Sequence, residues 1–92
     1  MRTSAAETLA LKALAHIAAD TETLQRFLAI TGLGPAELRS RAEEPELLAA
    51  ILDFVLSDDA ISERFAAAEG LETATLHQAR RALPGATNEQ PW

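Results

Sequence analysis

Two histidines, His16 and His77, are the only imidazole side chains in the 92-residue sequence. Imidazole titrates near neutral pH and is a common general base and metal ligand. A catalytic or metal site needs further His, Asp or Glu residues at suitable spacing, and neither histidine has such a set nearby. We expect His16 to fill a position at the edge of the core and His77 to lie on the surface. The sequence therefore predicts no catalytic residue and no metal site.

Two acidic pairs, Glu43-Glu44 and Asp58-Asp59, could supply carboxylates for acid–base chemistry or for calcium. Both lie where helices are predicted to begin, and acids are favoured there because they complement the positive end of the helix dipole. Neither pair has the spaced ligands and central glycine of a calcium loop. The sequence also has no phosphate-binding glycine loop, no hydrolase nucleophile elbow and no cysteine. We therefore expect a protein that is not an enzyme and that binds no cofactor.

Arginines are the third group with relevant chemistry, because they bind phosphates and carboxylates. The stretch "FLAITGLGPAELRSRA" has the pattern of a helix-turn-helix, whose second helix would present Arg39 and Arg41 to the DNA major groove. That helix begins with Glu37 in its first turn, and the net charge of −6 opposes binding to phosphates. DNA binding is therefore the alternative prediction, and no binding of nucleic acid is the preferred one.

The sequence contains Arg-Phe, four further residues and Gly-Leu twice, as "RFLAITGL" at 26–33 and "RFAAAEGL" at 64–71. The second copy follows the first by 38 residues, and Asp20 aligns with Asp58 at the same offset. A period of this length indicates one supersecondary unit built twice. Two copies are too few for a solenoid, so the repeat predicts a small pseudo-symmetric bundle. We expect Arg26 and Arg64 to cover helix edges and to pair with nearby acids, such as Glu22 for Arg26.

Capping residues predict where the helices begin and end. Ser4 and Glu7 match a capping box that would open the first helix. Asp20 and Asp58 are expected to cap the second helix of each unit. Glycine favours the left-handed conformation that ends many helices, and an apolar residue after it commonly folds back onto the last turn. The residues expected to close these two helices are Gly32, Leu33, Gly70 and Leu71.

Apolar residues at helical spacing predict the core. Pro35 and Pro45 each open a further helix, and the helix "PELLAAILDFVLS" is apolar nearly all round, so it is expected at the centre. The predicted core residues are Leu24, Phe27, Leu28, Leu48, Ile51, Leu52, Val55, Ile61 and Phe65. Abundant Ala and Leu with few aromatic residues favour helices over strands.

These features predict an all-α fold, a small bundle of about six helices built as two similar three-helix units. We expect one domain over residues 1–85, with the units at roughly 5–42 and 43–83, and a flexible C-terminal tail at 86–92. Asp53 interrupts the most apolar run, so no membrane-spanning segment is predicted and a cytoplasmic location is expected.

Three segments also show a resemblance to a known family: "LALKALAHIAAD", "LQRFLAITGLGPAELRSRA" and "LLAAILDFVLSDD…FAAAEGL". Together they resemble a family of short alphaproteobacterial proteins known as a domain of unknown function, over about residues 5 to 85. The resemblance implies a small cytoplasmic helical protein and supplies no catalytic or binding residues. The preferred prediction is a non-enzymatic protein-interaction module, acting on an unknown protein partner or by self-association. The alternative is a helix-turn-helix DNA-binding protein.

Overall fold

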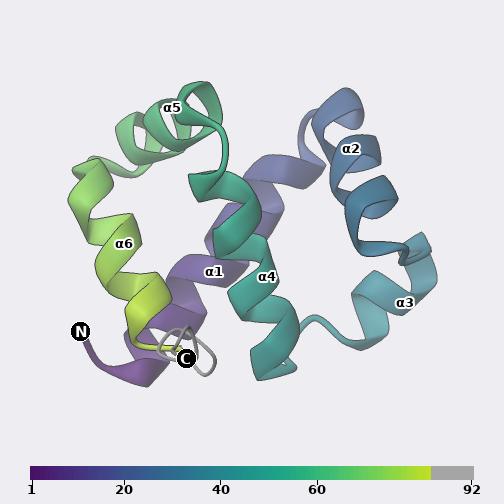
Figure 1. Ribbon diagram of the computed structural model, residues 1–92, viewed down its shortest axis with the longest axis horizontal. Helices are drawn as coiled ribbons and strands as arrows, with labels where there is room; N and C mark the ends of the chain where they lie inside the picture. The colour runs from purple at the N-terminus through teal and green to yellow at the C-terminus, as the bar shows by residue number, and fades with distance from the viewer. Residues whose placement is uncertain (84–92) are drawn as a thin grey trace, which may run out of the picture.

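The computed structural model describes residues 1–83, which form six helices joined by short connections (Figure 1). In chain order they are α1 (Thr3–Ala18), α2 (Thr21–Thr31), α3 (Pro35–Ser40), α4 (Pro45–Leu56), α5 (Asp59–Glu69) and α6 (Thr73–Arg81). No strand occurs among these residues, so the predicted all-α bundle of about six helices is confirmed. The predicted tail at 86–92, including Trp92, lies outside the described residues.

Helices α1 and α4 pack against each other at the centre of the bundle, and the other helices lie around them. Figure 1 shows α2 and α3 on one side of this pair and α5 and α6 on the other. Helix α4 contributes most to the core because apolar residues cover nearly its whole circumference. Its buried residues are Leu47, Leu48, Ala49, Ile51, Leu52, Phe54 and Val55. None of the helices among residues 1–83 is long and apolar enough to cross a membrane.

Most of the predicted core residues are buried: Phe27, Leu48, Ile51, Leu52, Val55, Ile61 and Phe65. Leu24 and Leu28 differ from the prediction, because they are only partly buried and pack at the edge of the core. Both lie on α2, next to α3. Helix α3 has only six residues, so it is too short to cover the stripe of α2 that the helical spacing had assigned to the core. This part of α2 therefore remains accessible.

The two glycines that were expected to close helices both have left-handed backbone conformations, with φ of 75° at Gly32 and 69° at Gly70. After Gly32, the closing bond runs from its own N–H to the carbonyl of Leu28, at 2.8 Å. After Gly70, the N–H of the following residue donates to the carbonyl of Ala66, also at 2.8 Å. Both bonds satisfy carbonyls that the helix end would leave without a partner. The leucines after the glycines are partly buried against the core: Leu33 and Leu71.

The N-caps of α2 and α5 use their aspartates differently. Asp58 accepts hydrogen bonds from the backbone N–H groups of Ala60 and Ile61, at 2.9 and 3.2 Å, as an N-cap side chain is expected to do. Asp20 occupies the same position at the start of α2, but its carboxylate makes no backbone cap bond. It accepts a hydrogen bond from the hydroxyl of Thr23 instead. The first unit therefore has a side-chain contact where the second has a backbone cap.

The predicted capping box at Ser4 and Glu7 is wrong. Helix α1 begins at Thr3, one residue before Ser4, and Arg2 occupies the N-cap position without a side-chain cap bond. Ser4 is thus already inside the helix, where its backbone carbonyl accepts the hydroxyl of Thr8 at 3.0 Å. The sequence pattern of a capping box was present, but the helical backbone extends past it by one residue.

The helix bounds follow the 38-residue offset of the sequence repeat. Shifting α2 by this offset reproduces both ends of α5, and shifting the last residue of α1 gives the last residue of α4. The third helices begin at equivalent positions but differ in length, since α3 has six residues and α6 has nine. Pro45 limits how far α3 could extend, because proline disfavours helical geometry at the residue before it, but α3 already ends at Ser40.

Candidate functional site

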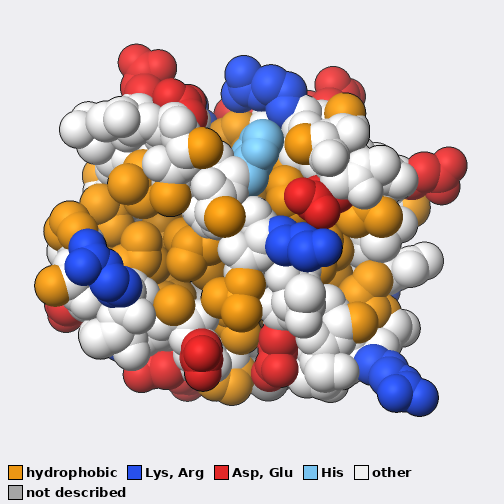
Figure 2. All heavy atoms as spheres, turned by 180° about the vertical axis from the view of Figure 1, so that it is seen from behind, with side chains coloured by type: hydrophobic (Ala, Val, Ile, Leu, Met, Phe, Trp, Pro, Cys, Tyr) orange, Lys and Arg blue, Asp and Glu red, His pale blue; other side chains and the backbone are white. Residues whose placement is uncertain are grey.

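An open groove of about 240 Å³ lies between the C-terminal half of α1, helix α2 and helix α3. Its lining is apolar except for one guanidinium, and consists of Leu14, Ala18, Leu24, Leu28, Pro35, Leu38, Ala42 and Arg39. Figure 2 shows the corresponding face, where apolar side chains form a broad area on the side of α2 and α3. Contiguous exposed apolar surface of this kind marks sites of interaction on soluble proteins. We therefore take this groove as the candidate functional site.

The equivalent surface of the second unit is closed. At the 38-residue offset, Leu14 and Leu38 of the groove correspond to Leu52 and Leu76, and both of these are 0% exposed. Helix α6 closes this surface, because it contributes Leu76 and packs against α1, α4 and α5 together. It also continues far enough to bury Ala79. The groove on the first unit is open because the shorter α3 cannot cover the same area.

Charge at the groove comes from Arg39, which is exposed on α3. Within residues 1–83, no carboxylate lies within ion-pairing distance of its guanidinium. Arg41, which was expected beside it on a recognition helix, lies past the end of α3 and pairs with Glu44 at 2.9 Å. The hydrogen bond to Glu44, with the charge of that carboxylate, raises the pKa of Arg41. Arg39 thus remains available to a partner, whereas Arg41 already has one.

The second unit repeats the helix-turn-helix pattern as "FAAAEGLETATLHQARRA", and Arg80 of its last helix, α6, pairs with Asp53 of α4 at 2.6 Å. Its side chain is mostly covered, with 18% exposed, so this guanidinium is part of the packing between α6 and α4. The arginines that suggested DNA binding therefore do not form one exposed basic face. Arg39, Arg41 and Arg80 have three different environments.

The carboxylate of Asp58 is held in its ionised form by neighbouring donors. Its pKa lies below the usual value, first because the backbone N–H of Ile61 donates to it, and then because the guanidinium of Arg26 does. Arg26 Nη2 lies 3.2 Å from Asp58 Oδ2, and the same guanidinium lies over the ring of Phe54, 5.8 Å from its centroid. Arg26 was expected to pair with Glu22 on its own helix. It reaches across to the second unit instead, a contact that only the tertiary fold creates.

Neither histidine belongs to a metal-binding cluster. Among residues 1–83 there is no group of three His, Asp or Glu side chains close enough together to hold a metal ion. His16 is partly buried with its ring 5.4 Å from that of Phe65, and His77 is exposed on α6. Sequence reasoning found these residues but missed the groove. The available signal was the short helix between Pro35 and Pro45, which was too short to cover the apolar stripe predicted on α2.

A family model described as "Protein of unknown function (DUF3572)" matches residues 3–86. The chain belongs to the DUF3572 family. The DUF3572 match spans all six helices and every residue that lines the groove. No curated protein and no solved structure shows significant similarity to the chain. The family description states no activity.

Proposed function

We propose that the protein is a non-enzymatic interaction module that binds an amphipathic helix of a partner protein in the groove between α1, α2 and α3. The observation that carries the proposal is the open apolar lining, whose equivalent in the second unit is filled by α6. Such a groove fits the apolar face of a helix, with anchoring residues three or four positions apart. In this proposal the partner helix covers the part of α2 that α3 is too short to cover.

The charge of the groove supports a partner helix with an acidic residue beside its apolar stripe. The molecule as a whole carries a net charge of −6, which disfavours acidic partners in general. At the groove, however, the charged lining residue is Arg39, and its guanidinium has no ion pair among the described residues. An acid placed opposite Arg39 would form a new pair and fix the orientation of the bound helix.

The first step of the test is to identify the partner by contact with the groove. A photo-crosslinking amino acid is placed at Leu28, in the groove, and in a matched variant at Ala29, the next and exposed position of α2. Both variants are expressed in the cells that produce the protein. We expect a protein to be crosslinked from position 28 and not from position 29. Equal crosslinking from both positions, or crosslinking to a second copy of the chain, would contradict the proposed partner.

The second step tests the helix and its acid. A synthetic peptide covering the crosslinked segment should become helical when it binds, and Arg39→Glu should weaken its binding about tenfold or more, as for loss of one charged hydrogen bond. Arg81→Glu is the matched control, because Arg81 is exposed on α6, away from the groove. Equal effects of the two charge reversals would show that only the net charge matters, and would refute the assignment to the groove.

We propose that the protein acts in the cytoplasm of a bacterium and without catalysing a reaction. The proposal of no catalysis is tested by the same crosslinked complex. A partner that is chemically changed after incubation with the wild-type chain, and unchanged with the Arg39→Glu variant, would make the groove a substrate site.

A further inference from the structure

The two units contact each other through two pairs of rings, and the 38-residue offset relates one pair to the other. Phe27 of the first unit packs edge-on against Phe54 of the second, with ring centroids 5.2 Å apart. The equivalents of these two residues are Phe65 and His16, and their rings also pack together, at 5.4 Å. The bundle therefore has two equivalent corners. The first joins α2 to α4, and the second joins α5 to α1.

The first corner is closed. Arg26 lies over the ring of Phe54 and pairs with Asp58, so the aromatic ring, the cation and the carboxylate are all in contact with protein groups. The other oxygen of Asp58 accepts the cap bonds of α5. This corner has no polar group left to offer to a ligand.

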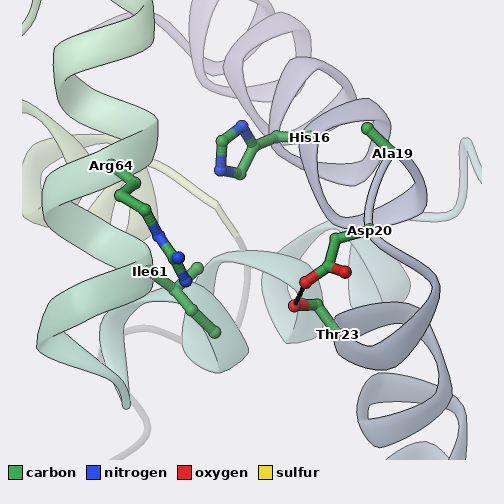
Figure 3. A pocket seen from close by; sticks show the side chains of 6 residues that line it. All are labelled: His16, Ala19, Asp20, Thr23, Ile61 and Arg64. Atoms are coloured by element: carbon green, nitrogen blue, oxygen red, sulfur yellow. Dashed lines mark hydrogen bonds between the residues drawn. The ribbon is translucent and has the colours of Figure 1, made fainter.

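The second corner is open and forms a pocket of about 240 Å³. Its lining consists of His16, Ala19, Asp20, Thr23, Ile61 and Arg64. Figure 3 shows the side chain of Arg64 on one side of this space, Asp20 and Thr23 on the other, and the ring of His16 above them. Arg64 is the equivalent of Arg26, but within residues 1–83 no carboxylate pairs with it.

Thr23 explains why this corner stays open. Its hydroxyl donates to the carboxylate of Asp20, which turns that carboxylate toward α2 (Figure 3). The equivalent of Thr23 in the closed corner is Ile61, which has no hydroxyl, so Asp58 is left to accept Arg26. Arg64 is close enough to lower the pKa of Asp20 through its charge, although the Thr23 hydrogen bond lowers it more. The pocket thus holds a cation and a carboxylate that face the same space without meeting.

We infer that this pocket binds a small monocarboxylate that carries a hydroxyl or ammonium donor next to its carboxylate group. Arg64 and the ring of His16 face the ligand carboxylate, since guanidinium offers paired donors that match its geometry. Asp20 accepts the neighbouring donor of the ligand. The apolar side chains of Ala19 and Ile61 leave room for a short carbon chain.

Asp20 also determines which anions the pocket rejects. A phosphate group carries between one and two negative charges at neutral pH, and the carboxylate of Asp20 would repel the additional charge. A monocarboxylate has a single charge, which Arg64 neutralises. This inference does not depend on the proposed helix-binding groove, which is lined by different residues.

The test uses three probes, lactate, acetate and inorganic phosphate, titrated into the isotopically labelled full chain and followed by NMR, with sodium chloride as the ionic-strength control. We expect lactate to cause saturable shifts at residues around His16 and Arg64, acetate to bind more weakly because it has no donor for Asp20, and phosphate to bind weakest. Arg64→Gln should weaken lactate binding about tenfold or more, as for loss of a charged hydrogen bond. The matched variant Arg26→Gln, at the equivalent position of the closed corner, should change it less than about twofold.

A second variant keeps the inference testable if Arg64→Gln perturbs the fold. The double substitution His16→Phe with Thr23→Ile copies Phe54 and Ile61 of the closed corner, so Arg64 should pair with Asp20 and lactate binding should be lost. The helical circular dichroism spectrum should be retained, since both substitutions copy residues that this fold already accommodates. The inference is overturned if no probe shifts the pocket resonances saturably, if phosphate binds more tightly than lactate, or if the double variant still binds lactate.

Discussion

Replacing Gly32 by alanine tests whether the left-handed backbone at this residue, which ends α2, needs glycine. With φ of 75°, Gly32 has a left-handed backbone, which costs an L-residue roughly 1–2 kcal/mol. A Cβ atom built there would meet no other heavy atom within 4 Å, so no steric clash adds to this cost. Alanine also restricts the unfolded chain, which returns about 0.4–1 kcal/mol. The difference is a destabilisation of about 0.5–1 kcal/mol, or a fall in Tm of roughly 4 °C for a domain of this size.

Two matched variants separate backbone conformation from other effects. Gly34 has an extended backbone with φ of −87°, and a Cβ there would only touch Glu37 Oε1 at an ordinary 3.8 Å. Alanine at Gly34 restricts the unfolded chain, which stabilises the protein, but it is a poorer N-cap residue than glycine, which destabilises it. Because the two effects oppose each other, Gly34→Ala should change the free energy of unfolding by less than about 0.5 kcal/mol. D-alanine at Gly32 favours positive φ and should stabilise the protein.

The assay is urea denaturation followed by circular dichroism, which reports the loss of helix directly. The predicted order of stability is D-alanine at Gly32 above wild type and L-alanine at Gly32 below it. If L-alanine at Gly32 were as stable as wild type, the left-handed closure would not contribute as described. If the D-alanine variant were the less stable of the two, the sign of φ at this position would be wrong.

Three further predictions concern the core, acid stability and nucleic acid. Phe27→Ala and Phe65→Ala should each destabilise by about 3–5 kcal/mol in urea melts, because both side chains are fully buried, and a loss below about 1 kcal/mol would contradict their place in the core. Asp58 has a lowered pKa, so its stabilising effect is present above its unfolded pKa near 3.8 and is lost as the pH falls further toward the folded value. Asp58→Asn should therefore be less stable than wild type at neutral pH, and the two should converge in acid-denaturation curves below that pH. Duplex DNA should not bind at physiological salt in a fluorescence anisotropy titration, because the net charge of −6 opposes the phosphate contribution, and binding that weakens with salt and is lost in Arg39→Ala with Arg41→Ala would refute this.

Local sequence signals predicted most helix boundaries because their physical cause is local. The prolines at 35 and 45 each begin a helix, and the glycines at 32 and 70 each follow the end of one, as their backbone preferences require. The failure at Ser4 has a local cause too, since a capping pattern does not prevent the helix from starting at Thr3, two residues before the start that a cap at Ser4 would give.

The groove and the pocket could not be predicted, because both depend on contacts between segments far apart in the sequence. Leu24 and Leu28 have the spacing of core residues, and only the length and docking of α3 determine how much of them is covered. The partner of Arg26 is Asp58, 32 residues away, whereas helical spacing pointed to Glu22. Periodicity identifies the buried face of a helix but not the element that covers it.

Each half of the chain depends on the other for the aromatic contacts of its core. Phe27 needs Phe54, and Phe65 packs against His16, so neither half of the sequence contains a complete core of its own. A chain cut between α3 and α4 should give two fragments that are each largely unfolded and that regain helicity when mixed, which circular dichroism can measure. The two halves are therefore expected to associate as two subunits of a dimer would. Since Arg26 and Asp58 form an ion pair across this internal interface while Asp20 and Arg64 of the open corner do not, substitutions at Asp20 and Arg64 should cost the fold less than substitutions at Arg26 and Asp58.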